Sequence, residues 1–264
     1  MTPREILFSW GLAGMCLLAF VATISTSTSA YTASCPVYQA RGLDAGTIVI
    51  GSSLALYAFA TDPDEAGPLA DVTVWSIPGI GLDHSLHLLR CAAETNVGNI
   101  LVEANTFAFG ENVLTDFTNQ VRSIIRQTLL GEVYRVDPGI GATASALRNH
   151  DWDGTRPAAR SGPWVPIQSA WVETLHDIGV SHPGRIFLFE PPRTALQFND
   201  ISPSFDPQET LSALADGASL PLITVGLVWE PSNFIDYHSH LNARGRVRFQ
   251  HEFAAAWQVV SDAH

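Results

Sequence analysis

Short apolar segments alternate with amphipathic segments from about residue 46 to residue 260, and this alternation constrains the fold more than any other feature. The period of the apolar residues predicts, in chain order, strands at 47–50, 71–77, 99–103, 185–190 and 222–229 and helices at 82–95, 111–132, 167–178, 207–215 and 241–260. Strands that alternate with helices form a mainly parallel sheet with helices on both faces. The sequence therefore predicts the α/β class, as a three-layer α/β/α sandwich around a mainly parallel five-stranded sheet.

The first 30 residues have a different character from the rest of the chain. Arg4 precedes an uncharged, mostly apolar run over residues 6–24, and small polar residues follow over 25–30. This order is typical of an export segment. The run of 19 residues is at the lower limit for a membrane-spanning helix. We therefore expect residues 1–30 to be either a signal peptide or an N-terminal membrane anchor. Residues 31–264 are then one extracytoplasmic domain, periplasmic or secreted.

Charge and cysteine content exclude several classes of function. The net charge of −12 and the lack of a basic patch argue against a nucleic-acid partner. All 14 basic residues are arginine, so lysine-based chemistry is excluded. Cys35 and Cys91 are the only cysteines of the exported part, because Cys16 lies within the export segment. They form either a disulfide, which an oxidising compartment permits, or two unpaired buried thiols.

Polar residues that suit acyl-transfer chemistry follow several of the predicted strands. Ser53 follows the first strand, Asn105 the third, and the cluster from Asp236 to His240 the last. Active groups of such sheets gather at the carboxyl ends of the strands. A serine hydroxyl becomes an effective nucleophile when a base takes its proton, and His240 is a candidate for that base. Taken alone, Gly51-Ser52-Ser53-Leu54 also fits a serine that caps the start of a helix.

The order and spacing of these blocks over about residues 46–260 resemble the SGNH (GDSL-like) hydrolase superfamily. Gly51-Ser52-Ser53-Leu54 is similar to its Gly-Asp-Ser-Leu block, with Ser53 as the nucleophile. The resemblance implies that His240 is the base and that residues 31–264 form an SGNH hydrolase-like domain. It also implies an oxyanion hole, the set of N–H donors for the negative oxygen formed during the reaction. Its expected members are the backbone N–H groups of Ser53 and of Gly79 or Gly81, together with the Asn105 side chain.

Three positions depart from the pattern of that superfamily. Ser52 replaces the Asp of the first block, and Glu103 replaces the Gly that usually stands two residues before the Asn. Tyr237 occupies the position three before His240, where the superfamily has its acid, and Asp236 lies one residue earlier. We expect Asp236 to orient His240, with a backbone carbonyl as the alternative.

The expected function is that of a serine esterase or O-acyltransferase that forms a Ser53 acyl-enzyme without a cofactor or metal. The resemblance implies an acyl-ester substrate such as the O-acetyl groups of an extracytoplasmic polysaccharide. The alternative is a non-catalytic binding or assembly protein of cell-surface polysaccharide export, which the departure at Tyr237 favours. A zinc site at His238, His240 and Asp236 is a weaker alternative, because the sequence has no convincing set of remaining ligands. Arg193 is interpreted as a binding group for an anionic or sugar substrate or as an ordinary surface arginine.

Overall fold

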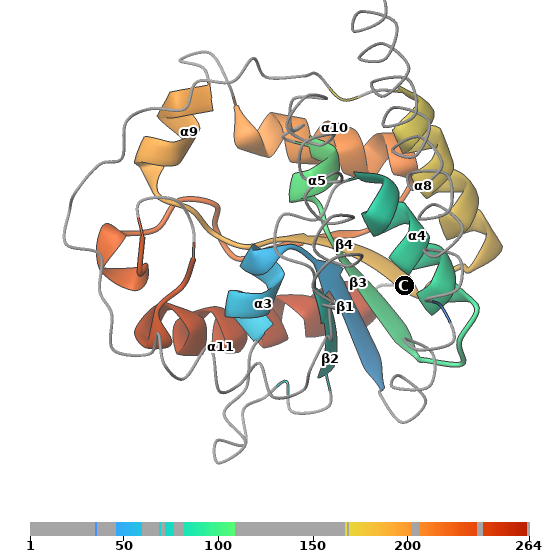
Figure 1. The fold of residues 1–264 in the computed structure, drawn as a ribbon, viewed down its shortest axis with the longest axis horizontal. Helices are drawn as coiled ribbons and strands as arrows, with labels where there is room; N and C mark the ends of the chain where they lie inside the picture. Colours follow the sequence, from blue (N-terminus) through green and yellow to red (C-terminus); the bar gives the residue numbers. More distant parts are fainter. Residues whose placement is uncertain are drawn as a thin grey trace, which may run out of the picture.

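The structure, a computed structural model, describes residues 35, 46–59, 69, 72–76, 82–108, 167, 169–201, 206–236 and 240–262, with the backbone alone for 83, 84, 106 and 199–201. These residues form a five-stranded, all-parallel sheet with helices on both faces (Figure 1). The predicted fold class, a three-layer α/β/α sandwich, is confirmed.

The elements alternate along the chain as the apolar period predicts. The strands are β1 (Thr47–Gly51), β2 (Val72–Ser76), β3 (Asn99–Glu103), β4 (Ile186–Glu190) and β5 (Leu222–Thr224). The α-helices are α3 (Ser53–Phe59), α4 (Leu82–Ala93), α5 (Asn105–Ala108), α8 (Ser169–Ser181), α9 (Ala195–Ile201), α10 (Pro207–Ala218) and α11 (Ala243–Asp262), and the 3-10 helix is η1 (Pro231–Asn233).

The strand order, β2-β1-β3-β4-β5, reverses direction at β1. The chain leaves β1 for the β2 edge and then returns across β1 to β3, so the connections on its two sides run in opposite directions. Ligands of open α/β sheets bind at such a switch point, beyond the carboxyl ends of the strands. Ile50 of β1 pairs with Val102 of β3, and Ser53 and Asn105 each follow this pair by three residues. The two residues therefore emerge side by side at the switch point.

Two apolar cores lie on opposite faces of the sheet, because successive strand residues point to opposite sides. One core combines alternate residues of β1, β3 and β4 with the helices α4, α8 and α10, through residues such as Ile50, Leu89 and Leu214. The other combines the remaining strand residues with α3 and α11, through Phe59, Phe249 and Phe253. The rings of Phe59 and Phe253 meet edge to face at 5.1 Å.

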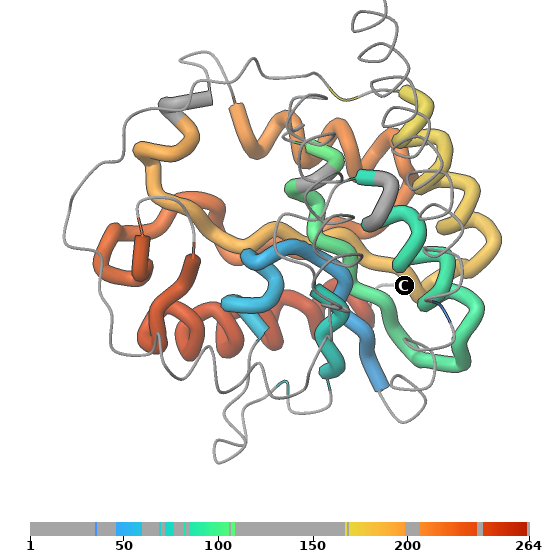
Figure 2. Tube along the Cα trace, viewed as in Figure 1, coloured from blue at the N-terminus to red at the C-terminus, as the bar shows by residue number. Residues whose placement is uncertain are grey.

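Helix α3, from the first half of the chain, packs against α11, the last helix. Figure 2 shows these helices, blue and red, on the same face of the sheet. The Gln250 side chain of α11 donates a hydrogen bond of 3.2 Å to the Ala58 carbonyl of α3. This contact holds the residues that precede α11 close to those at the start of α3.

The structure also corrects several predicted boundaries. The last strand ends at Thr224 rather than at Trp229, because Gly226 adopts a φ of 86° and turns the chain out of the sheet. The short helices α3, α5 and α9 were not predicted, since seven residues or fewer give little periodic signal. The helix predicted at 111–132 lies outside the described residues.

None of the helices that the structure describes has the length and apolarity needed to cross a membrane. The predicted export segment, residues 1–30, lies outside the described part of the chain.

Candidate active site

Ser53 begins α3, directly after the turn that ends β1. The turn requires glycine at position 51, because a Cβ there would lie 2.5 Å from Glu103 Oε2 and 2.5 Å from the Ala55 Cβ. The Ser53 N–H belongs to the first helical turn, whose N–H groups have no acceptor within the helix. The hydroxyl and the N–H of Ser53 are thus both presented at the carboxyl edge of the sheet.

The capping role that a Gly-Ser-Ser sequence suggests belongs to Ser52 rather than to Ser53. The Ser52 hydroxyl accepts a hydrogen bond of 3.1 Å from the Leu54 N–H. It donates to Glu103 Oε1 at 2.8 Å, while Glu103 Oε2 accepts from the N–H groups of Ser52 at 2.8 Å and Ala55 at 3.1 Å. Ser52 and Glu103 are therefore hydrogen-bond partners, and the Glu103 carboxyl group holds the start of α3.

His240 lies between Ser53 and Asp236. Its Nε2 is 2.8 Å from Ser53 Oγ, within the hydrogen-bond distance that a nucleophile and its base require. Its Nδ1 forms a short hydrogen bond with Asp236 Oδ2, and Asp236 Oδ1 accepts from the His240 backbone N–H at 3.1 Å. The carboxylate thus holds the imidazole in the tautomer whose Nε2 can accept the Ser53 proton.

Hydrogen bonds fix the residues that flank positions 237–239. The Ile235 N–H donates to the His240 carbonyl at 2.9 Å. The Asn242 side chain donates to the Ser232 carbonyl at 2.9 Å and accepts from the Gly245 N–H at 2.9 Å, which caps α11. A loop anchored in this way lets an acid four residues before the histidine reach Nδ1. The positions of Tyr237 and His238 lie outside the described residues.

Tyr57, one helical turn after Ser53, contacts the imidazole from the side. The Tyr57 and His240 rings meet edge to face with centroids 4.8 Å apart. Partial burial and then the nearby Asp236 carboxylate raise the pKa of the Tyr57 hydroxyl above its usual value of 10.0. The ring therefore restricts the motion of the imidazole and remains a neutral phenol near neutral pH.

Asn105 follows β3 and is bound to Arg193, a residue that the sequence interpretation misplaced. The Arg193 Nη2 donates a short hydrogen bond to Asn105 Oδ1 and another of 2.6 Å to Glu190 Oε1. Arg193 is 3% exposed, so it is neither a surface arginine nor open to a substrate. Both interpretations made from the sequence are wrong, since a lone arginine after Glu190-Pro-Pro gives no sign of its burial.

Glu103, Glu190 and Arg193 form a buried charge cluster behind the edge of the sheet. The two carboxyl groups are each 1% exposed. Burial raises the pKa of Glu103, against the opposing effects of its Ser52 hydrogen bonds and of Arg193. Burial raises the pKa of Glu190 to about 7; Arg193 opposes this rise, and the Glu103 charge adds to it. Near neutral pH the Glu190 carboxyl group is therefore partly protonated, whereas an exposed glutamate would be ionised.

Part of this cluster is recognisable as a pattern in the sequence. Glu103 and Glu190 are charged residues that end apolar strands, and β3 and β4 are adjacent and parallel. Two acids at neighbouring strand ends must be paired, hydrogen-bonded or protonated. The identity of their cationic partner depends on the chain path after β4, which local patterns do not encode.

Gly79 and Gly81, the predicted backbone donors of the oxyanion hole, lie outside the described residues. Ser53, Asn105, Asp236 and His240 are the predicted site residues that the structure describes. Ser53, His240 and Asp236 form a hydrogen-bonded chain, and Asn105 follows the neighbouring strand.

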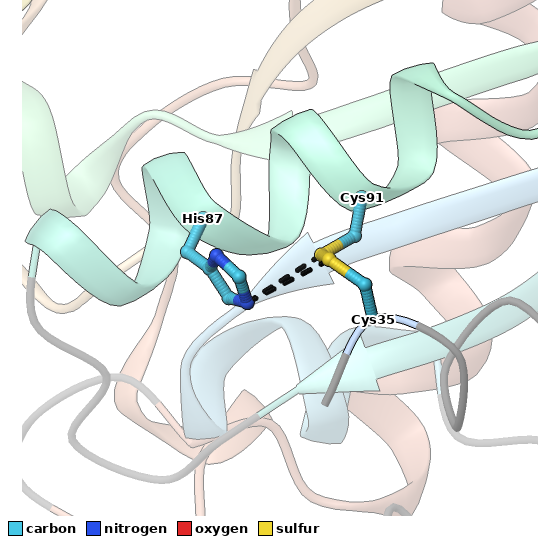
Figure 3. A group of neighbouring side chains, drawn as sticks. All are labelled: Cys35, His87 and Cys91. Atoms are coloured by element: carbon cyan, nitrogen blue, oxygen red, sulfur yellow. Dashed lines mark hydrogen bonds between the residues drawn. A yellow bond between two sulfur atoms is a disulfide. The ribbon is translucent and has the colours of Figure 1, made fainter. Parts of the chain in front are cut away.

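Cys35 and Cys91 form a disulfide with Cα atoms 5.3 Å apart, beside the His87 ring (Figure 3). The His87 Nε2 is 3.5 Å from Cys91 Sγ and 3.7 Å from Cys35 Sγ. Among the described residues, these three form a group whose side chains are of types that can bind a metal ion. As a disulfide, the two sulfurs are not thiolate ligands, so the oxidised group offers a cation the imidazole alone.

A scan against protein-family models gives no match, and a search of curated proteins gives none either.

Proposed function

We propose that this protein is an SGNH-like serine esterase or O-acyltransferase that works through a Ser53 acyl-enzyme. The observation that carries the proposal is the continuous chain from Ser53 Oγ to His240 Nε2, at 2.8 Å, and from His240 Nδ1 to Asp236. This arrangement satisfies the geometric roles of a nucleophile, a base and an orienting group.

The proposed reaction has two halves. Ser53 Oγ forms a bond to the ester carbonyl carbon while His240 Nε2 takes the hydroxyl proton. The carbonyl electron pair moves to the oxygen, where the Ser53 N–H and the Asn105 amide are the expected donors. The intermediate collapses, and the leaving alcohol takes the proton from His240. A water molecule or a sugar hydroxyl then attacks the acyl-enzyme, gives its proton to His240 and releases Ser53.

The proposed substrate is an acyl ester, such as an O-acetyl group of an extracytoplasmic polysaccharide. Water as acceptor gives an esterase and a sugar hydroxyl gives a transferase, with the same first half-reaction. The Cys35–Cys91 disulfide supports the extracytoplasmic part of the proposal, because disulfides persist in oxidising compartments.

The competing proposal is a binding or assembly protein that keeps the fold without catalysis. Its main support was Tyr237 at the position of the acid. The contact between Asp236 and His240 weakens that support, because the imidazole has its carboxylate partner.

Labelling of the purified protein by a fluorophosphonate probe tests the proposal. We expect one serine to react, and we expect labelling to be lost in Ser53→Ala and retained in Ser52→Ala, the matched neighbour. Ser52→Ala also removes a buried hydrogen bond, so its folding is checked by circular dichroism. Absence of labelling in a folded wild-type protein would favour the non-catalytic alternative.

A further inference from the structure

Arg193 is fixed in place by both its backbone and its side chain. Its N–H donates to the Leu227 carbonyl at 2.8 Å, and its carbonyl accepts from the Trp229 N–H at 2.9 Å. Its Nε and Nη2 donate to Glu190 Oε1 at 3.0 and 2.6 Å. The guanidinium is therefore held on a rigid support at the carboxyl edge of the sheet, where a substrate does not reach it.

The contact with Arg193 determines the orientation of the Asn105 amide. A guanidinium has only donors, so the atom of Asn105 that faces it must be the oxygen, Oδ1. The two Nδ2 hydrogens then point to the other side of the amide, away from Arg193. A flipped amide would place its N–H₂ group against the guanidinium and lose this hydrogen bond.

The position of Asn105 makes this orientation relevant to the reaction. Asn105 and Ser53 follow paired residues of neighbouring strands by the same number of positions. An N–H donor at this place can bind the oxygen on which negative charge develops when Ser53 attacks. The fixed amide needs no rearrangement during the reaction, which is the condition under which such a donor is most effective.

We propose that Arg193, held by Glu190, is a positioning residue that fixes the Asn105 amide with its Nδ2 directed to the oxyanion. This inference rests on the proposed acyl-enzyme function and deepens it. The positive guanidinium also polarises the amide through Oδ1 and makes Nδ2 a stronger donor. The resemblance of Asn105 to the asparagine of the superfamily does not predict Arg193 as its partner.

A double-mutant cycle tests whether Arg193 acts through Asn105. The full chain is measured for hydrolysis of p-nitrophenyl acetate as wild type, Asn105→Ala, Arg193→Met and the double variant. Removal of an oxyanion donor lowers kcat on the order of 100-fold. We expect Arg193→Met to lower kcat about 10- to 100-fold with little change in KM. The double variant should be no slower than Asn105→Ala, because the amide through which Arg193 acts is already absent.

Three controls separate positioning from a general loss of structure. Arg90→Met removes an exposed guanidinium on α4 and should leave kcat within about twofold. Glu190→Gln keeps an oxygen that can accept from Arg193 and should retain most of the activity that Glu190→Leu loses. Asn105→Asp keeps Oδ1 for Arg193 but removes the Nδ2 donor, so it should fold and be as slow as Asn105→Ala. This last variant carries the test if Arg193→Met does not fold.

The outcomes distinguish this inference from the proposed function. Wild-type protein without esterase turnover and without fluorophosphonate labelling would overturn both. An active wild type whose Arg193→Met and Asn105→Ala effects multiply in the double variant would overturn the positioning role alone. Asn105→Asp with wild-type kcat would do the same.

Discussion

The site contains two hydrogen-bonded pairs, each of a carboxyl group and a basic side chain, that differ in exposure. The side chains of Asp236 and His240 are 29% and 26% exposed, whereas those of Glu190 and Arg193 are 0% and 4% exposed. A group that transfers protons must reach substrate and solvent, and the first pair does. A group that fixes the geometry of another benefits from burial, which limits its motion. In the proposed reaction, the exposed pair would transfer protons and the buried pair would hold the Asn105 amide in place.

Breaking the exposed pair should have the largest effect on activity. Asp236→Asn leaves the size of the side chain unchanged but favours the wrong imidazole tautomer, so kcat should fall about 10⁴-fold. Thermal unfolding should change little, because the pair is partly exposed. Tyr237→Phe is the matched control at the position where the superfamily has its acid, and we expect it to be nearly as active as wild type. Equal activity of Asp236→Asn and wild type in ester hydrolysis would contradict the role of Asp236.

Removing the buried carboxyl group of Glu103 should reduce the free energy of unfolding more than a substitution of any exposed residue. Glu103→Ala leaves the N–H groups of Ser52 and Ala55 and the Ser52 hydroxyl without their acceptor. Loss of one partner from a buried charged network costs about 3–5 kcal/mol. Urea unfolding measures this loss. Glu103→Gln keeps an acceptor oxygen and should lose less than half as much stability. Equal losses in the two variants would contradict the role of Glu103 as the acceptor of these hydrogen bonds.

The buried pair should also produce a pH dependence of stability. The pKa of Glu190 is raised from its ordinary value of 4.5 to about 7, by burial first and with an added contribution from Glu103. The folded protein therefore keeps a proton that the unfolded chain loses, and this contribution to stability is complete below pH 4.5. It is lost as pH rises to about 7, with a slope of at most about 1.4 kcal/mol per pH unit.

Glu190→Gln tests this dependence, because its amide does not titrate. Urea unfolding between pH 4.5 and 8 should show a flatter profile for the variant than for wild type. Arg193 and the Asn105 N–H, which oppose the rise, and Glu103, which adds to it, all remain in the variant. Parallel profiles for the two proteins would show that Glu190 does not retain the proton.

The smallest effect is expected at the surface pair of Arg248 and Glu252 on α11. Their side chains are 46% and 41% exposed, and the Nε–Oε1 distance is 2.7 Å. Solvent screening limits such pairs to about 0.5 kcal/mol, so Glu252→Ala should shift the free energy of unfolding by no more than that. A larger loss in urea unfolding would contradict the expectation that exposed ion pairs stabilise this protein less than buried ones.

The sequence predicted the fold well where the apolar period is long or the strand is buried on both faces. The strand at 99–103 and the start of the helix at 207 match the structure, and Asp206 caps that helix through the N–H groups of Gln208 and Glu209. The strand predicted at 222–229 was too long, because the left-handed conformation of Gly226 is not encoded by the apolar pattern.

The candidate site was likewise predicted in part. Ser53 and His240 were predicted from their order, and Asp236 from the absence of an acid at position 237. The roles of Glu190 and Arg193 were not predicted, since they depend on a contact with Asn105, which is distant in sequence. The choice between disulfide and free thiols for Cys35 and Cys91 was open for the same reason: spacing along a chain does not give distance in space.

The disulfide also fixes an orientation for the molecule. Helix α4 connects two parallel strands, so it runs back from their carboxyl ends, and Cys91 lies near its final turn. Cys35 is therefore fastened near the amino ends of the strands, opposite Ser53. Eleven positions separate Ile24 from Cys35, which reach at most about 40 Å when fully extended. If residues 6–24 remained in a membrane, this short tether would leave the serine facing outward, toward material beyond the bilayer surface rather than toward lipid.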